Sequence, residues 1–232
     1  MSEVRGLRLA PSAAAREKRL AALLEGRPPG PALQEAVEDA QLLGSLELAG
    51  LPVSWGEVVG SRHRPGPEPV MALRRARAAV DPGAPVGVAS LRAWQTALLG
   101  PGAGFRTAPH PREGTAPPEL IPGRLAVLEE WLNGDSGRDL KPVQQAALAL
   151  ARIVEILPFP DGNGRVSRLA AAHLVARGGL RPPILAGGDR PRLEGCLRAA
   201  FRLDTEPLCA LLVEASDRGL DVMIQTLERS PG

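Results

Sequence analysis

The sequence predicts an all-α protein, a bundle of helices around one central buried helix. Apolar residues recur three and four positions apart in one segment after another, as they do on the buried face of a helix. Pro- and Gly-rich stretches separate these segments, and segment 142–156 is apolar nearly all round, which indicates burial on several sides. The segments expected to be helical are 12–24, 32–44, 70–80, 88–99, 119–133, 142–156, 165–177, 190–202, 206–215 and 220–227.

The first two helices are expected to be separated by a break. Ser12 precedes the first one and can cap its N-terminus, and Leu20 and Leu24 lie on one face of it. The Pro/Gly stretch 26–31 then interrupts the pattern. The second helix is expected to end at Gly44, because glycine commonly follows a helix C-terminus.

The later helices carry a core face and a few polar or sulfur-containing side chains. Leu91 and Trp94 belong to the predicted core face of 88–99. His173 lies among apolar residues two turns after the start of its helix, so we interpret it as a structural residue. Cys196 and Cys209 lie in helical, apolar stretches, and buried free thiols are favoured over a disulfide or a metal pair.

Composition limits the classes of function. The chain has 232 residues with 44% hydrophobic content, enough for one domain with an extension or for two small domains, and we favour one domain. A net charge of +2 gives no case for a nucleic-acid surface, and the predominance of arginine over lysine is typical of GC-rich coding. There is no signal-peptide pattern and no apolar run near the roughly 18 residues that cross a membrane. We therefore expect a cytoplasmic protein that binds neither nucleic acid nor membrane.

One stretch, Leu157 to Arg168 (LPFPDGNGRVSR), has a pattern that indicates chemistry. Gly162 and Gly164 flank Asn163 just before a helix expected to begin near residue 165. Several backbone N–H groups can therefore converge at a helix N-terminus, an arrangement that binds anions and phosphate above all.

Charged side chains in the same stretch add to this pattern. Arg165 and Arg168 are three residues apart and share a helical face, where their guanidinium groups suit phosphate oxygens. Asp161 is placed to hold a divalent cation that bridges two phosphates. The alternative interpretation is a helix-start turn with a pair of surface arginines.

The stretch resembles the signature loop of the Fic (Fido) family, H-P-F-x-[D/E]-G-N-G-R-x-x-R, and departs from it only at Leu157, where that family has histidine. In the family this histidine is the general base that deprotonates the target hydroxyl, so the resemblance implies a nucleotide cradle without a catalytic residue. It also implies ATP or another nucleotide as ligand and Mg²⁺ on Asp161. The cofactor-binding residues implied are Pro158, Phe159, Asp161, Gly162, Asn163, Gly164, Arg165 and Arg168.

The resemblance extends over residues 31–216 and implies a Fic-type helical bundle, with 1–30 as an N-terminal helical extension and 217–232 as a C-terminal helical tail. Many family members carry an inhibitory helix with the pattern [S/T]-x-x-x-E-[G/N], whose glutamate pairs with the second arginine of the signature loop. Ser45 and Gly50 fit that pattern, but Ala49 occupies the glutamate position. Glu47 is a shifted candidate, although residues two apart do not share a helix face.

A second resemblance concerns the flap of the family, a small β-hairpin that aligns a target chain by strand addition. Phe105, Arg106 and Thr107 resemble the end of the segment G-x-[FY]-R-T that opens the flap. Pro109 and Pro111 follow, and they cannot donate ladder hydrogen bonds. We therefore expect a small irregular or β-hairpin flap. His110 is interpreted as an exposed loop residue, with a role in the site as the alternative. The residues implied to contact a protein partner or target are Phe105, Arg106 and Thr107.

Three functions follow as hypotheses. The first is a pseudoenzyme that binds a nucleotide or another phosphate ligand without efficient AMP transfer. The second is a divergent transferase that moves AMP or a related phosphate group to a hydroxyl. The third is a structural or interaction protein whose cradle stays empty. The pseudoenzyme is favoured by Leu157. It is also favoured by Leu150, which stands where many family members have a second histidine.

Overall fold

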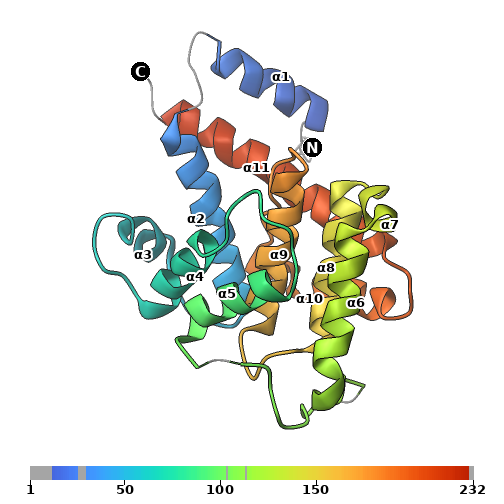
Figure 1. Ribbon diagram of the computed structural model, residues 1–232. Helices are drawn as coiled ribbons and strands as arrows, with labels where there is room; N and C mark the ends of the chain where they lie inside the picture. The colour runs from blue at the N-terminus through green and yellow to red at the C-terminus, as the bar shows by residue number, and fades with distance from the viewer. Residues whose placement is uncertain (1–11, 26–29, 103, 113, 230–232) are drawn as a thin grey trace, which may run out of the picture.

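The computed structural model describes residues 12–25, 30–102, 104–112 and 114–229, so the expected lead-in at 1–11 and most of the break at 26–31 lie outside the described residues. The described part is all-α and contains no strand, which confirms the predicted class (Figure 1). Its α-helices are α1 (Ala13–Leu23), α2 (Pro31–Leu48), α3 (Trp55–Gly60), α4 (Glu68–Ala78), α5 (Val88–Leu99), α6 (Ile121–Asn133), α7 (Asp135–Arg138), α8 (Pro142–Ile156), α9 (Asn163–Arg177), α10 (Arg190–Ala200) and α11 (Glu206–Arg229), with 3₁₀ turns at η1 (Pro118–Leu120) and η2 (Gly187–Asp189).

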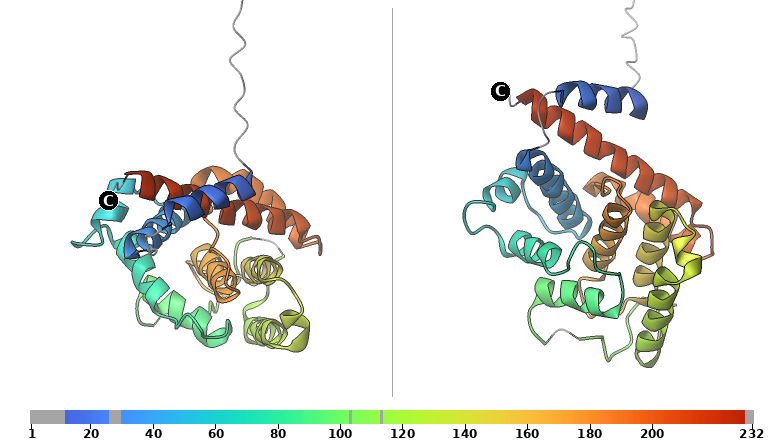
Figure 2. Two further views of the ribbon diagram at one scale, coloured as in Figure 1. Left: turned by 90° about the horizontal axis from the view of Figure 1, so that it is seen from above. Right: turned by 45° about the horizontal axis from the view of Figure 1, so that its top comes forward.

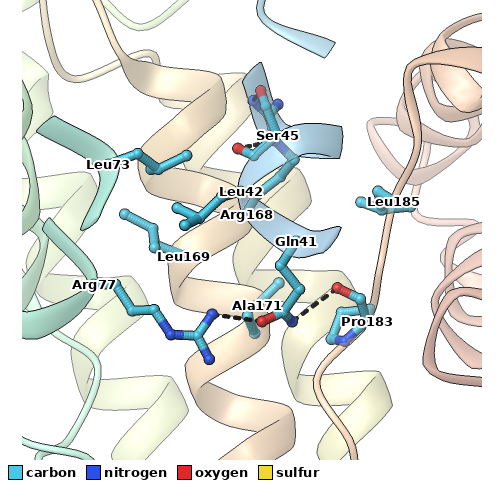
Figure 3. A pocket seen from close by; sticks show the side chains of 11 residues that line it. Gln41, Leu42, Ser45, Leu73, Arg77, Arg168, Leu169, Ala171, Pro183 and Leu185 are labelled. Atoms are coloured by element: carbon cyan, nitrogen blue, oxygen red, sulfur yellow. Dashed lines mark hydrogen bonds between the residues drawn. The ribbon is translucent and has the colours of Figure 1, made fainter. Parts of the chain in front are cut away.

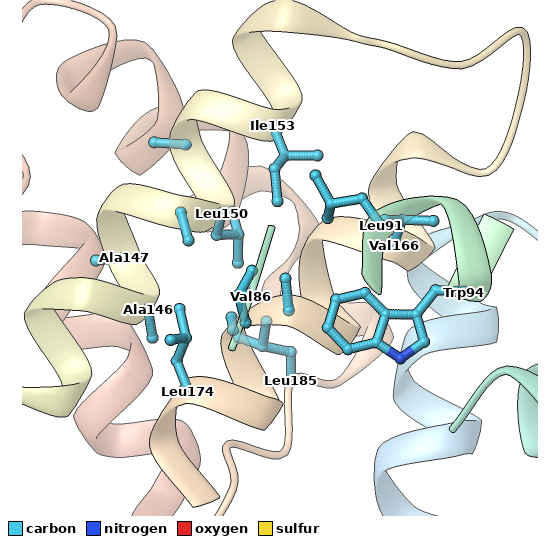
Figure 4. Packing of buried hydrophobic residues seen from close by; sticks show 14 of the residues in the cluster. Val86, Leu91, Trp94, Ala146, Ala147, Leu150, Ile153, Val166, Leu174 and Leu185 are labelled. Atoms are coloured by element: carbon cyan, nitrogen blue, oxygen red, sulfur yellow. The ribbon is translucent and has the colours of Figure 1, made fainter. Parts of the chain in front are cut away.

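Helix α8 is the centre of the bundle and packs against α6, α9, α10 and α11 (Figure 2). Ala146 and Ala147 are fully buried on it, and the small side chains let neighbouring helices approach closely. Leu150 and Ile153 fill the space beside them (Figure 4). Each such large aliphatic side chain contributes about 1.5–3 kcal/mol by leaving water. The expected central buried helix is therefore confirmed.

Helix α2 does not end at Gly44 as predicted but runs four residues further, to Leu48. A Cβ atom at Gly44 would lie 1.7 Å from the carbonyl oxygen of Leu185, so glycine is needed for a close approach of the segment before η2. Gln41 on the same helix donates to the carbonyl of Pro183 at 3.1 Å. The glycine thus marks a contact with another segment and not a helix end.

Helix α3 was not predicted, although its start carries a recognisable signal. Ser54 and Glu57 form a capping box, in which the Ser54 side chain accepts from Glu57 N–H and the Glu57 carboxylate accepts from Ser54 N–H at 2.7 Å. Nearby, Arg62 and Arg74 both pair with Asp39 of α2, whose side chain is fully buried. These pairs fasten the segment from α3 to α4 onto α2.

Helix α11 is continuous and unites the two helices predicted at 206–215 and 220–227. The expected boundary at residue 216 therefore falls inside a helix. Helix α1 lies along its C-terminal half, where Leu20 packs with Leu220 and Ile224 (Figures 1 and 2). Among the described helices, none has the length and apolar content required to cross a membrane.

Candidate phosphate-binding site

The loop between α8 and α9 is closed by the side chain of Asn163. Its Oδ1 accepts from Phe159 N–H at 2.9 Å, and its Nδ2 donates to the Phe159 carbonyl at 2.7 Å. Asn163 is 7% exposed. The amide group therefore fixes the loop shape, and only the backbone of Asn163 remains available to a ligand.

Helix α9 begins at Asn163, two residues earlier than predicted, after Gly162 with a φ of 80°. That left-handed conformation favours glycine. Asp161 Oδ1 accepts the Gly162 N–H at 2.6 Å, so this donor is already used. Within the described chain, the N–H groups of Asn163, Gly164 and Arg165 have no hydrogen-bond partner. These free N–H groups lie at the positive end of the helix dipole.

A cavity of about 300 Å³ lies over these donors. Three parts of the chain line it: residues 160–165 with Arg168, the C-terminal end of α2 with residues 48, 49 and 51, and His110 of the flap. Pro158 and Phe159 are not among the lining residues. Phe159 is fully buried and packs against Phe105, with ring centroids 5.7 Å apart.

The two arginines of the loop have different partners. Arg165 pairs with Asp161 at 3.0 Å. Arg168 donates from Nε to Ser45 Oγ at 3.0 Å and from a terminal nitrogen to the Ser45 carbonyl at 2.7 Å (Figure 3). No carboxylate forms an ion pair with Arg168 in the described part of the chain. Neutral groups accept its hydrogen bonds and leave its charge uncompensated.

Burial lowers the pKa of Arg168 to about 9, and the neighbouring charges of Arg165 and Arg190 act in the same direction. The site thus disfavours the cationic form of a side chain that is normally always charged. A bound anion would supply the missing opposite charge. The surroundings of Arg168 therefore suit a group with negative charge.

Glu47 does not replace the missing inhibitory glutamate. Its Oε2 accepts from Gly187 N–H at 2.9 Å, and its carbonyl accepts from Arg190 at 2.8 Å. Both contacts join the end of α2 to η2 and the start of α10. Ala49 lines the cavity in its place, and a methyl group cannot pair with Arg168.

The position of the family's histidine is apolar. Leu157 ends α8 in a left-handed conformation with a φ of 47°, and it is 7% exposed. Leu150 and Ile153 on the preceding turns are buried. An aliphatic side chain accepts no proton, so the site lacks a base at this position.

The flap segment is held by Arg106, which sequence reasoning assigned to a protein partner. Arg106 is 5% exposed and donates to the carbonyls of Leu157 at 2.7 Å, Ile156 at 3.2 Å and Ala108 at 3.0 Å, as well as to that of Ala116. Its guanidinium therefore joins both ends of the flap to the end of α8 and is buried away from any partner. Phe105 is packed in the same region, whereas Thr107 is exposed.

Asp161 is the candidate metal ligand. Its side chain is 72% exposed at the cavity, and both carboxylate oxygens accept hydrogen bonds, from Gly162 and Arg165. The described residues contain no cluster of three or more metal-ligating side chains. One carboxylate suffices for Mg²⁺ only when phosphate oxygens complete the coordination. The residues therefore fit Mg²⁺ bound together with a polyphosphate.

Comparison with known proteins agrees with this geometry. Residues 87–175, which include the flap and the loop, match the model of the Fic/DOC family. The chain is therefore similar to the Fic/DOC family over this segment. It is 38% identical over 115 residues to the protein adenylyltransferase Fic of Drosophila willistoni and 37% identical over 107 residues to that of Drosophila melanogaster. These matches cover 48% and 44% of this chain but only 23% and 22% of those proteins.

Solved structures show the same Fic fold. Fic-1 (aa134–508) from C. elegans superposes with a TM-score of 0.72 at 20% identity, covering 92% of this chain and 72% of that one. A Fic domain containing signaling protein from Bacteroides thetaiotaomicron gives a TM-score of 0.73 at 19% identity, covering 94% and 97%. The expected Fic-type helical bundle is therefore confirmed beyond the segment that the family model matches.

Two contacts of the candidate site differ from the favoured sequence interpretation. Ser45 was noted only as part of a pattern, whereas in the structure it holds Arg168. His110 was interpreted as an exposed loop residue, with a role in the site as the alternative, and it is half-buried and lines the cavity. Both contacts join residues far apart in the chain, and spacing along the sequence gives no signal for them.

Proposed function

We propose that this Fic/DOC domain binds a nucleotide or another polyphosphate in the cavity over α9 and does not transfer AMP efficiently. The observation that carries the proposal is Arg168, a partly buried cation without a carboxylate partner among the described residues. Three free N–H groups add positive potential at the same cavity, and Arg165 beside them is paired with Asp161. Phosphate groups are the ligands that match such an arrangement.

The low transfer rate follows from Leu157. A target hydroxyl is a poor nucleophile at neutral pH until its proton is removed. A positioned general base contributes about 10² to 10⁴-fold to such a step. The aliphatic side chain at this position supplies no such contribution. Ile153 and Leu150, four and seven residues earlier on α8, are also aliphatic.

Calorimetric titration with ATP, ADP and pyrophosphate, each with and without Mg²⁺, tests the binding. We expect saturable binding to the wild type and at least a tenfold weaker affinity for Arg165→Ala. Arg138→Ala is a matched control, because Arg138 is an exposed arginine on α7 and does not line the cavity. Absence of heat with all three ligands would contradict the proposal.

When Mg²⁺ is bound with the ligand, it would neutralise phosphate charge, and Asp161 is the residue that would hold it. Asp161→Asn should then reduce the dependence of affinity on Mg²⁺ while leaving metal-free binding within about threefold. Equal Mg²⁺ dependence in both proteins would remove Asp161 from this role.

A second candidate function is favoured by the relatives, which are named protein adenylyltransferase. Under this alternative the domain transfers AMP by a divergent mechanism. Incubation with labelled ATP and cell lysate separates the two functions. Transfer by the wild type would support the divergent transferase, and transfer only by Leu157→His would support the loss of the base.

A third alternative, an interaction protein with an empty cradle, is less favoured. It would require both arginines to be neutralised internally, and Arg165 meets that condition through Asp161. Arg168 does not, because its partner Ser45 is neutral.

A further inference from the structure

We propose that His110 of the flap donates a hydrogen bond from Nε2 to an oxygen of the phosphate ligand in the cavity over the α9 N-terminus. The inference rests on the proposed function. His110 lines the same cavity as Gly164, Arg165 and Arg168, although some fifty residues separate it from them. It adds a ligand-binding residue that lies outside the α8–α9 loop.

The orientation of the ring follows from its one internal hydrogen bond. Arg112 N–H donates to His110 Nδ1 at 3.0 Å. An accepting Nδ1 carries a lone pair, so the proton of the neutral ring must reside on Nε2. Nε2 has no hydrogen-bond partner among the described residues. The ring is therefore a donor with one free N–H.

Arg112 holds this arrangement in place. Its side chain donates to the Val154 carbonyl at 2.5 Å and lies over the ring of Phe201, 5.5 Å from its centroid. These contacts fix the backbone of Arg112 against α8 and the end of α10, and with it the N–H that orients His110. The flap therefore presents the imidazole from an anchored segment.

The charges around His110 favour the neutral ring in the absence of ligand. Desolvation lowers the pKa of His110 most, and the positive charges of Arg106 and Arg112 lower it further. Arg165 and Arg168 line the same cavity, and Asp161 is the one carboxylate there. A neutral imidazole with Nε2–H can donate to a phosphate oxygen, but it offers no lone pair at Nε2 to act as a base.

Two measurements test the proposal. Long-range ¹H–¹⁵N correlation spectra of the ligand-free protein report the tautomer, and we expect His110 as the Nε2–H form. A Nδ1–H tautomer would overturn the inference and would instead make Nε2 available as a base. The three histidines are assigned with His110→Gln and His63→Ala.

Calorimetric titration with Mg²⁺–ATP gives the second test. We expect His110→Ala to weaken binding about tenfold, the loss of one hydrogen bond to a charged acceptor, and His110→Gln to restore most of the affinity through its amide N–H. His63→Ala, a change in an exposed loop, should leave the affinity unchanged. Wild-type affinity in His110→Ala would overturn the inference while leaving the proposed function intact. Absence of wild-type binding would overturn both.

Discussion

Arg168 of α9 is held by Ser45 of α2 through two hydrogen bonds, at 3.0 Å to the hydroxyl and 2.7 Å to the carbonyl. Helix α2, whose end resembles the family's inhibitory helix, is thus attached to Arg168 of the signature motif by neutral groups. An ion pair would compete with an anionic ligand for the guanidinium, whereas these dipoles leave its charge uncompensated. The connection is therefore compatible with a ligand in the adjacent cavity.

Replacing Ser45 by alanine should destabilise the protein. The change leaves the Nε–H of Arg168 without its acceptor, and an unsatisfied donor of a charged group costs about 1–3 kcal/mol of unfolding free energy. Urea denaturation measures the loss. Ser216→Ala is the control, because Ser216 only donates to a carbonyl within α11, and its removal should change stability by less than about 0.5 kcal/mol. Equal effects of the two changes would contradict the importance of the Ser45 contact.

Introducing a carboxylate at Ala49 should weaken ligand binding. Residues 45 and 49 are four apart at the end of α2 and share a face, so a glutamate at 49 can reach Arg168. We expect Ala49→Glu to reduce the affinity for Mg²⁺–ATP at least tenfold by supplying an internal anion. Ala49→Gln has nearly the same size without the charge and should cost less than threefold. If both variants weaken binding equally, the effect is steric and not electrostatic.

At Leu157, glycine should be better tolerated than alanine. Both changes remove a buried side chain, but only glycine relieves the left-handed backbone at φ 47°. That relief is worth about 1–2 kcal/mol and is partly offset by the greater freedom of glycine in the unfolded chain. We expect Leu157→Gly to be about 0.5–1 kcal/mol more stable than Leu157→Ala in urea denaturation. The reverse order would show that the backbone conformation adds no strain here.

Changing Arg106 to lysine should loosen the flap. Lysine keeps the charge but loses the forked donors that reach four carbonyl groups. We expect a loss of about 2–3 kcal/mol and faster hydrogen exchange in residues 104–117. Arg92→Lys, at an exposed arginine that only lies over the Phe105 ring, is the matched control. Unchanged exchange in the flap of Arg106→Lys would contradict the anchoring role.

Acid should weaken the attachment of η2 to α11. Desolvation raises the pKa of Asp189. Hydrogen bonds from Arg218 and from the Ala186 N–H lower it, as do the charges of the nearby arginines. The lowering effects are larger, so the pKa lies below its ordinary value of 3.8. A lowered carboxylate pKa contributes stability above the unfolded value that is lost as pH falls through the folded value. Urea midpoints of the wild type should fall below about pH 4 more steeply than those of Asp189→Asn. Parallel pH profiles would contradict this assignment.

The sequence by itself determined the helical class, the central buried helix and the Fic-type loop. Helical periodicity and the fixed geometry of a Gly-rich turn before a helix are local properties, so they can be read from neighbouring residues. Leu157 could be identified for the same reason, because it is defined by its position in a contiguous motif.

Only the tertiary structure decided what surrounds that loop. Gly44 predicted a helix end because local spacing cannot show the carbonyl of Leu185 packed against it. Ser45 and His110 reach the cavity from elements distant in sequence, and Arg106 is internal because both ends of the flap converge on it. These relationships depend on how helices pack in three dimensions, and packing brings together residues that no spacing along the chain connects.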